Sequence, residues 1–169
     1  MVKPRVHKVL LQYPNDNTLK KFKDIIDIEG LEYIINWKHE SKLNRISQLI
    51  EFSIEHEIDT CFDLKMFLLD NSNRAKLLNL DGIGLKTLDY SLKLLNFDVV
   101  AVDRHIYAFV EKADIENRSY EFTKKILEFA ADLLDVSRHS LDYSIWSYMS
   151  NKNVIPKVDN QLELNFMTV

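Results

Sequence analysis

Two of the three glycines in this chain of 169 residues lie two positions apart, between apolar segments whose spacing is typical of helices. Glycine permits a positive φ and lets the backbone approach a ligand without a Cβ in the way. The pair Gly82 and Gly84 therefore indicates a tight hairpin between two helices. The first backbone N–H groups of the second helix would be left unpaired, and such donors suit a phosphate.

The rest of the sequence predicts helices along most of its length. Hydrophobic residues make up 46% of it, and three prolines and three glycines rarely interrupt the pattern. We expect helices near residues 19–28, 31–37, 43–54, 63–69, 73–80, 87–96, 104–110, 122–134 and 140–150, with an apolar connector at 97–102. The prediction is an all-α domain over residues 1–153, either a single bundle or two small helical lobes.

The last residues, 154–169, are predicted to be an extended tail. They contain Pro156, and they alternate Leu162, Leu164 and Phe166 with polar residues. This pattern fits a disordered tail and a tail docked on a lobe equally well.

Several classes of site and protein are excluded by composition and motif. The single Cys61 excludes a disulfide framework and any four-cysteine zinc or iron–sulfur site within this chain. The histidines have no metal-ligand spacing, and there is no phosphate-binding Walker loop or Ser-His-Asp arrangement. No apolar run approaches the roughly 20 residues that span a bilayer. We expect a soluble, cytoplasmic protein without a catalytic metal.

Charge gives little support for a nucleic-acid partner. The net charge is −4, whereas surfaces that bind phosphates are usually basic. Residues 74–104 contain five bases and four acids, so the region around the glycines carries only +1.

Two motifs around the glycines are more specific. Gly-Ile-Gly-Leu-Lys-Thr occupies residues 82–87, and Val-Val-Ala-Val-Asp-Arg-His-Ile-Tyr occupies residues 99–107. Together they resemble the helix-hairpin-helix DNA glycosylase superfamily, which includes endonuclease III and the 8-oxoguanine glycosylases. The Asp-Arg-His-Ile form is most similar to the second type of 8-oxoguanine glycosylase/AP lyase. The resemblance covers residues 30–152 and implies a two-lobed helical bundle.

The resemblance implies base-excision repair of an oxidised purine, 8-oxoguanine first, by a monomer that acts on duplex DNA with a damaged base or an abasic site. Lys86 matches the nucleophile that displaces the base and forms a Schiff base before β-elimination. Asp103 matches the carboxylate that stabilises charge on the sugar. Taken alone, Lys86 is typical of a solvated helix lysine, and Asp103 of a helix N-cap.

The family's DNA contacts map onto further positions. The hairpin residues expected to bind a DNA phosphate are Leu80, Gly82, Ile83, Gly84 and Thr87. Residues expected to contact DNA or the flipped base are Tyr90, Arg104, His105, Asp142 and Trp146, with Tyr143 beside them. Each also has a structural explanation, as a core aromatic, an exposed arginine or a hydrogen-bonded histidine. No cofactor is expected, apart from a monovalent cation that family members hold through hairpin carbonyls.

The chain departs from the family at several points. Residues 1–29 contain no equivalent of the loop that wedges into the duplex. Asp81 stands where relatives have proline or lysine, and it would place a like charge beside the phosphate and weaken binding, unless it turns outward or binds a cation. The iron–sulfur loop of endonuclease III is absent, as in the 8-oxoguanine branch. Two alternatives stay open: a non-catalytic module that binds DNA or abasic sites, and a helical interaction protein without DNA affinity.

Overall fold

The computed structural model describes residues 3–15, 17–116 and 119–150, and within them it contains ten helices and no strand. The predicted all-α fold is confirmed. The predicted tail, residues 154–169, and the end of the predicted domain at 153 lie outside the described residues. In the part of the chain that is described, no helix is long and apolar enough to cross a membrane.

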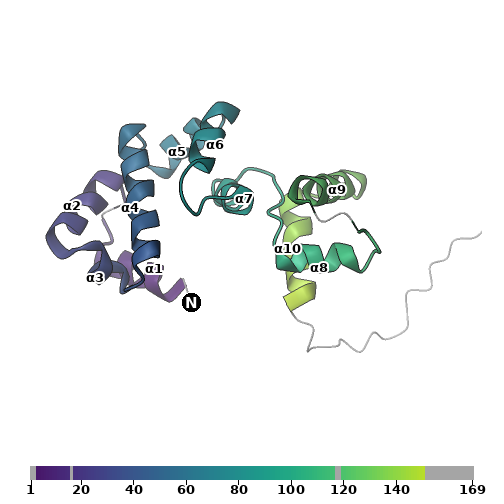
Figure 1. Ribbon diagram of the computed structural model, residues 1–169, viewed down its shortest axis with the longest axis horizontal. Coiled ribbons are helices and arrows are strands. Elements are labelled where there is room, and N and C mark those ends of the chain that lie inside the picture. The colour runs from purple at the N-terminus through teal and green to yellow at the C-terminus, as the bar shows by residue number, and fades with distance from the viewer. Residues whose placement is uncertain (1–2, 16, 117–118, 151–169) are drawn as a thin grey trace, which may run out of the picture. The chain divides into compact units, whose positions relative to one another are not determined.

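The chain divides into two compact units, Met1–Val99 and Val100–Val169, called here the first and the second unit. The first unit contains α1 (Lys3–Gln12), α2 (Leu19–Glu29), α3 (Leu31–Ile35), α4 (Glu40–Glu55), α5 (Cys61–Phe67), α6 (Asn71–Leu78) and α7 (Leu85–Leu94) (Figure 1). The second contains α8 (Arg104–Glu111), α9 (Tyr120–Leu133) and α10 (Arg138–Ser150). Helix α1 has no counterpart among the predicted helices.

Five predicted helices, those of α5, α6, α7, α9 and α10, begin two residues later than the observed ones. At α5, α6 and α9 the side chain of the N-cap residue, and not the apolar pattern, marks where the helix begins. At α5, Thr60 and Asp63 form a capping box. The hydrogen bonds from the hydroxyl and backbone of Thr60 lower the pKa of the Asp63 carboxyl. At α6, the Asp70 carboxylate accepts from the backbone N–H of Ser72, 2.8 Å away.

The core of the first unit is built on α4, α6 and α7. Its buried residues are Phe52, Ile58, Leu68, Leu77, Leu88, Leu92 and Leu95. Leu80 and Ile83, the two apolar residues of the hairpin, pack against this core. Apolar burial contributes about 25 cal/mol per Å² of surface removed from water, so these side chains anchor the hairpin between its helices.

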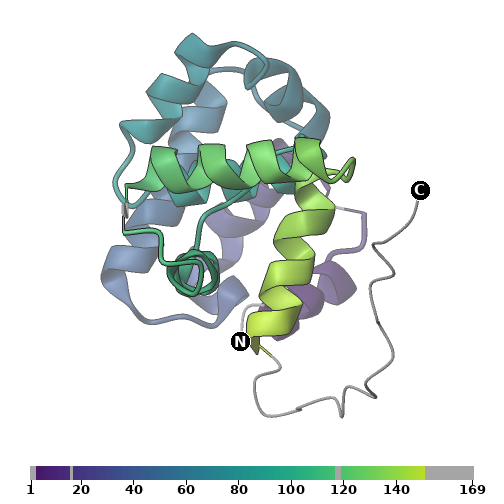
Figure 2. The same ribbon diagram turned by 90° about the vertical axis from the view of Figure 1, so that its right-hand side faces the viewer.

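The second unit is a separate core in which α8 and α9 both contact α10. Figure 2 shows α9 crossing α10, with α8 seen end-on beside them. The buried residues are Val100, Val102, Ile106, Val110, Leu127, Ile145 and Met149. Two of them, Val100 and Val102, belong to the predicted connector, which is non-helical and lies directly before Asp103.

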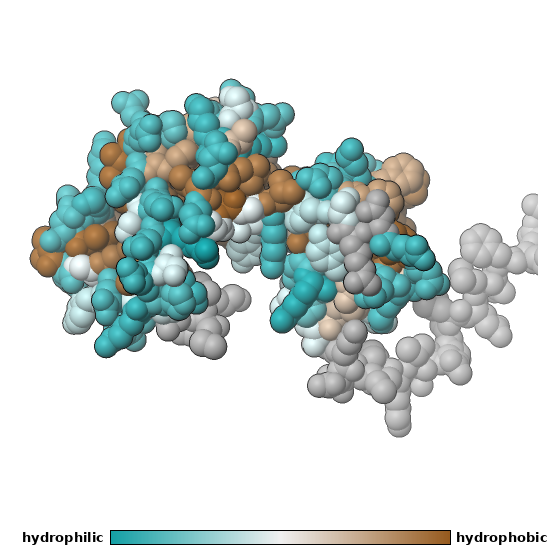
Figure 3. Space-filling model, in the orientation of Figure 1, coloured by the Kyte–Doolittle hydropathy of each residue, from teal (hydrophilic) through white to brown (hydrophobic). Residues whose placement is uncertain are grey.

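Both units also present large apolar side chains at the surface. Brown, hydrophobic atoms are visible among the hydrophilic ones in the space-filling view (Figure 3). Exposed examples include Phe62, Met66 and Leu94 in the first unit and Phe129 and Leu133 in the second.

Candidate functional site

The glycine hairpin lies between α6 and α7, as the sequence predicts. Its turn is closed by the backbone N–H of Ile83, which donates to the carbonyl of Leu80 at 3.1 Å. Gly82 has a φ of +78°, in the region that side chains other than glycine rarely adopt. The hairpin is therefore a defined turn with apolar anchors.

The N-terminus of α7 is open. Gly84 is its N-cap and makes no side-chain hydrogen bond, and the first turn contains no acidic residue. The first bond to the cap is donated by Leu88 to the Gly84 carbonyl, at 3.0 Å. Within the described residues, the amides of Leu85, Lys86 and Thr87 have no acceptor. These donors and the helix dipole form a positive end that is available to an anion.

The two glycines differ in what surrounds them. A Cβ on Gly84 would meet no atom within 4 Å. A Cβ on Gly82 would lie 2.5 Å from Nε, 2.6 Å from Cδ and 2.9 Å from Cζ of Arg45. The space that a Cβ would take at Gly82 is thus occupied by a side chain from α4, whereas the same space at Gly84 is empty. That a DNA strand approaches both glycines stays a prediction.

Arg45 also changes the electrostatic effect expected of Asp81. Its Nε lies 3.0 Å from Oδ2 of Asp81, and the two side chains are 48% and 65% exposed. The acid expected to repel a phosphate is thus paired with a guanidinium. The sequence gives no sign of this pair, because Arg45 lies 36 residues from Asp81 and no local pattern connects them.

The expected nucleophile, Lys86, is the second residue of α7, and its side chain is exposed. Tyr90, one turn further along, is exposed on the same helix face, whereas Leu88 and Leu92 point into the core. Thr87 is partly exposed. The alternative explanation of Tyr90 as a core aromatic is therefore wrong.

Asp103 is the N-cap of α8, as predicted. Its Oδ1 accepts from the backbone N–H groups of His105, at 2.8 Å, and Ile106, at 3.1 Å. Its other oxygen, Oδ2, accepts no hydrogen bond from any described residue. One carboxylate oxygen thus caps the helix while the second is not used by the fold.

The next two residues extend the polar start of α8. Arg104 is exposed, and its Nε lies 3.4 Å from Nε2 of the partly buried His105. This distance is long for a hydrogen bond, so the pair constrains the arginine weakly. The Arg104 side chain can therefore reorient toward a ligand.

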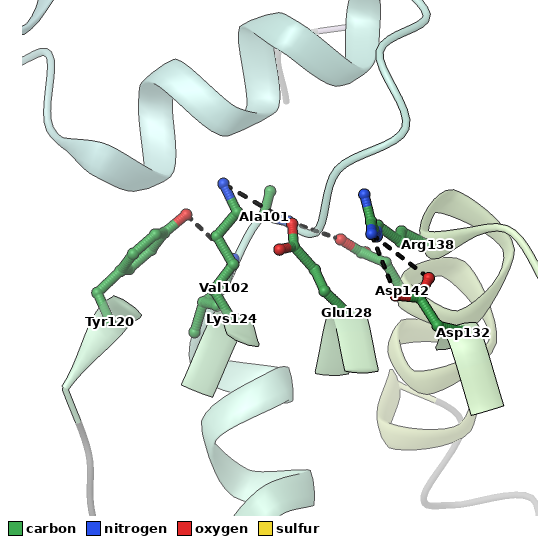
Figure 4. A network of polar contacts seen from close by, with 8 residues as sticks. All are labelled: Ala101, Val102, Tyr120, Lys124, Glu128, Asp132, Arg138 and Asp142. Atoms are coloured by element: carbon green, nitrogen blue, oxygen red, sulfur yellow. Dashed lines mark hydrogen bonds and ion pairs between the residues drawn. The ribbon is translucent and has the colours of Figure 1, made fainter. Parts of the chain in front are cut away.

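Asp142 holds the connector in place. It is buried on α10, and its Oδ2 accepts from the backbone N–H of Ala101 at 2.9 Å (Figure 4). The hydroxyl of Tyr120 accepts from the N–H of Val102 at 3.3 Å. These two contacts fix the chain immediately before Asp103. Asp142, expected to touch DNA or a base, thus serves a positioning role in this structure.

Trp146 and Tyr143 are exposed on α10, and Trp146 borders the stripe formed by the buried Asp142, Ile145 and Met149. Their rings are stacked, with centroids 6.0 Å apart and planes inclined by 30°. Neither ring is part of the core. Exposed aromatic faces of this kind can stack on a nucleic-acid base.

The candidate residues are thus distributed over two units. Leu80, Gly82, Ile83, Gly84, Lys86, Thr87 and Tyr90 belong to the first; Asp103, Arg104, His105, Asp142 and Trp146 belong to the second. Among the described residues, no group of three or more His, Cys, Asp or Glu side chains is placed to hold a metal ion. In comparisons with protein-family models, curated proteins and solved structures, nothing matched this chain.

Proposed function

We propose that this protein is a DNA repair enzyme, a bifunctional N-glycosylase and AP lyase that removes an oxidised purine, with 8-oxoguanine as the first substrate to test. The observation that carries the proposal is the start of α7, where unpaired amides and an exposed lysine follow the glycine hairpin. The motif at residues 99–107 adds a carboxylate with an unused oxygen. Its substrate would be duplex DNA inside the cell.

Each group has a defined chemical task in this proposal. The neutral amine of Lys86 attacks C1′ of the deoxyribose as the bond from C1′ to the damaged base breaks, and the base leaves with a proton. The C1′–O4′ bond then breaks, which opens the sugar and gives the Schiff base. Loss of a proton from C2′ and cleavage of the C3′–O bond, a β-elimination, cut the strand at the 3′ side. Oδ2 of Asp103 stabilises the positive charge that develops on the sugar, while Oδ1 keeps the helix cap.

The hairpin would bind the strand next to the reacting sugar. The amides of Leu85, Lys86 and Thr87 would donate to one phosphate, and Gly84 would let that phosphate approach. A monovalent cation at the hairpin would be held by the carbonyls of Gly82 and Ile83, which accept no hydrogen bond within the described residues. Such a cation would offset phosphate charge without taking part in the chemistry.

Trapping with borohydride tests the proposal directly, because reduction converts a Schiff base into a stable covalent adduct. The protein is incubated with duplexes that contain 8-oxoguanine or an abasic site. We expect an adduct with both duplexes, no adduct or strand cleavage with Lys86→Gln, and DNA affinity nearly unchanged in that variant. Equal cleavage by Lys86→Gln and the parent protein would refute the mechanism.

A second candidate is a non-catalytic module that binds DNA or abasic sites. It is favoured by the fact that Asp103 already has a complete role as a helix cap. This module needs the hairpin but neither the amine of Lys86 nor the second oxygen of Asp103. It predicts salt-dependent DNA binding without any trapped adduct.

A further inference from the structure

The side chain of Arg45 lies against the hairpin, beside Asp81 and Gly82. Its Nε donates a hydrogen bond to Oδ2 of Asp81, and its Nε, Cδ and Cζ atoms occupy the space beside Cα of Gly82. Any residue with a Cβ at position 82 would force this side chain to move. Glycine at position 82 therefore leaves room for the Arg45 side chain, and it also permits the positive φ of the turn.

Stability of the fold does not account for this arrangement. About half of the Arg45 side chain and most of the Asp81 side chain are exposed, and exposed ion pairs contribute little to folding. The hairpin is anchored by Leu80 and Ile83, which pack into the core of the first unit. The ion pair instead fixes the direction of a guanidinium at the surface.

The remaining donors of Arg45 are available. A guanidinium has five N–H groups in a planar fork, and Asp81 uses the one on Nε. Within the described residues, the two terminal nitrogens have no acceptor. Asp81 orients the guanidinium through Nε, and the two terminal nitrogens can then donate together to the oxygens of one phosphate.

We propose that Arg45, on α4, binds a DNA phosphate beside the hairpin and that Asp81 orients its guanidinium for this contact. The inference rests on the proposed function, because it adds a residue to the same DNA-binding surface. It also explains the acid at position 81. Asp81 is tolerated beside DNA because its charge is paired, and loss of Arg45 would leave it as an unpaired repulsive group.

The test measures the affinity of the full chain for an abasic-site duplex as a function of salt. Each neutralised phosphate contributes about 0.9 to the slope of log K against log salt concentration in duplex DNA. We expect Arg45→Ala to lower this slope by about one and to weaken binding roughly tenfold at 0.1 M salt, the equivalent of one charged hydrogen bond. Arg45→Gln keeps the side chain as far as Cδ and a polar amide without the charge, and it should lose the same slope.

A matched control is available on α2. Lys23 is exposed to a similar degree, and it is also paired with an acid, Asp27 of its own helix. Lys23→Ala removes the same unit of charge from the first unit and should leave the slope unchanged. Arg45→Lys should recover the slope but only part of the affinity, because an ammonium lacks the fork.

The outcomes separate this inference from the proposed function. If the parent protein forms the borohydride adduct and both neutral Arg45 variants keep its slope and affinity, the role of Arg45 is refuted and the enzyme assignment stands. If the neutral Arg45 variants lose no more of the salt slope than Lys23→Ala does, the role of Arg45 is refuted as well. If the parent protein has no salt-dependent DNA affinity, both proposals fail. Melting temperatures of the variants verify that they fold.

Discussion

The N-termini of α7 and α8 carry the two halves of the motif, and they are built in opposite ways. Helix α7 begins with Gly84, whose missing side chain leaves the first amides without an acceptor among the described residues. Helix α8 begins with Asp103, whose Oδ1 accepts from two of its first amides. Their cap residues have similar extended backbones, with φ of −101° and −118°.

This difference shows that backbone geometry is not what distinguishes the two ends. An extended cap can hold either a glycine or an aspartate, and the side chain decides whether the helix dipole is neutralised within the protein or left for a ligand. In the proposed enzyme, α7 provides positive potential for a phosphate. Helix α8 provides a carboxylate whose position is fixed by the amides that it caps.

Substitution of Asp103 gives the largest expected effect. Asparagine and serine are N-caps of similar strength to aspartate, so Asp103→Asn and Asp103→Ser should keep the melting temperature within a few degrees. Both remove the carboxylate, and base excision should slow by about 100-fold or more. Single-turnover excision and thermal melting measure the two properties separately. Unchanged excision in both variants would leave Asp103 as a helix cap only.

The variant Gly84→Asp would give α7 the same kind of N-cap that α8 has. A Cβ at this position meets no neighbour within 4 Å, and the backbone already has the conformation of an N-cap. The new carboxylate should cap α7 and retain or raise its stability. DNA affinity should fall about tenfold or more, since the amides are occupied and a like charge faces the phosphate.

Gly84→Ala is the control for that variant, because it adds a methyl group without a charge or an acceptor. Fluorescence anisotropy with a labelled abasic duplex measures both affinities. If Gly84→Asp binds DNA as tightly as Gly84→Ala does, the start of α7 is not the phosphate site.

Gly82→Ala gives the smallest expected effect and separates the two glycines. The positive φ of Gly82 disfavours alanine, at a cost of about 1 kcal/mol in the free energy of unfolding. The added Cβ also displaces the Arg45 side chain. We expect Gly82→Ala to melt below Gly84→Ala in thermal denaturation monitored by circular dichroism. Equal melting temperatures would contradict the difference between the two positions.

Sequence reasoning predicted the hairpin, the helices around it and the Asp103 cap, but it gave no sign of Arg45, whose side chain fills the space beside Gly82 and pairs with Asp81. It also left open whether Tyr90 and Trp146 are core residues, and the structure places both at the surface.

The features that the sequence determined by itself depend on neighbours within one helical turn. Apolar spacing sets the helices, a positive φ at Gly82 needs no distant partner, and Asp103 caps amides two and three residues ahead. Two contacts depend on the packing of distant segments: Arg45 meets Asp81, 36 residues away, and Asp142 accepts from the amide of Ala101, 41 residues away. Such contacts arise when helices pack, and packing depends on the whole core, which no local pattern contains.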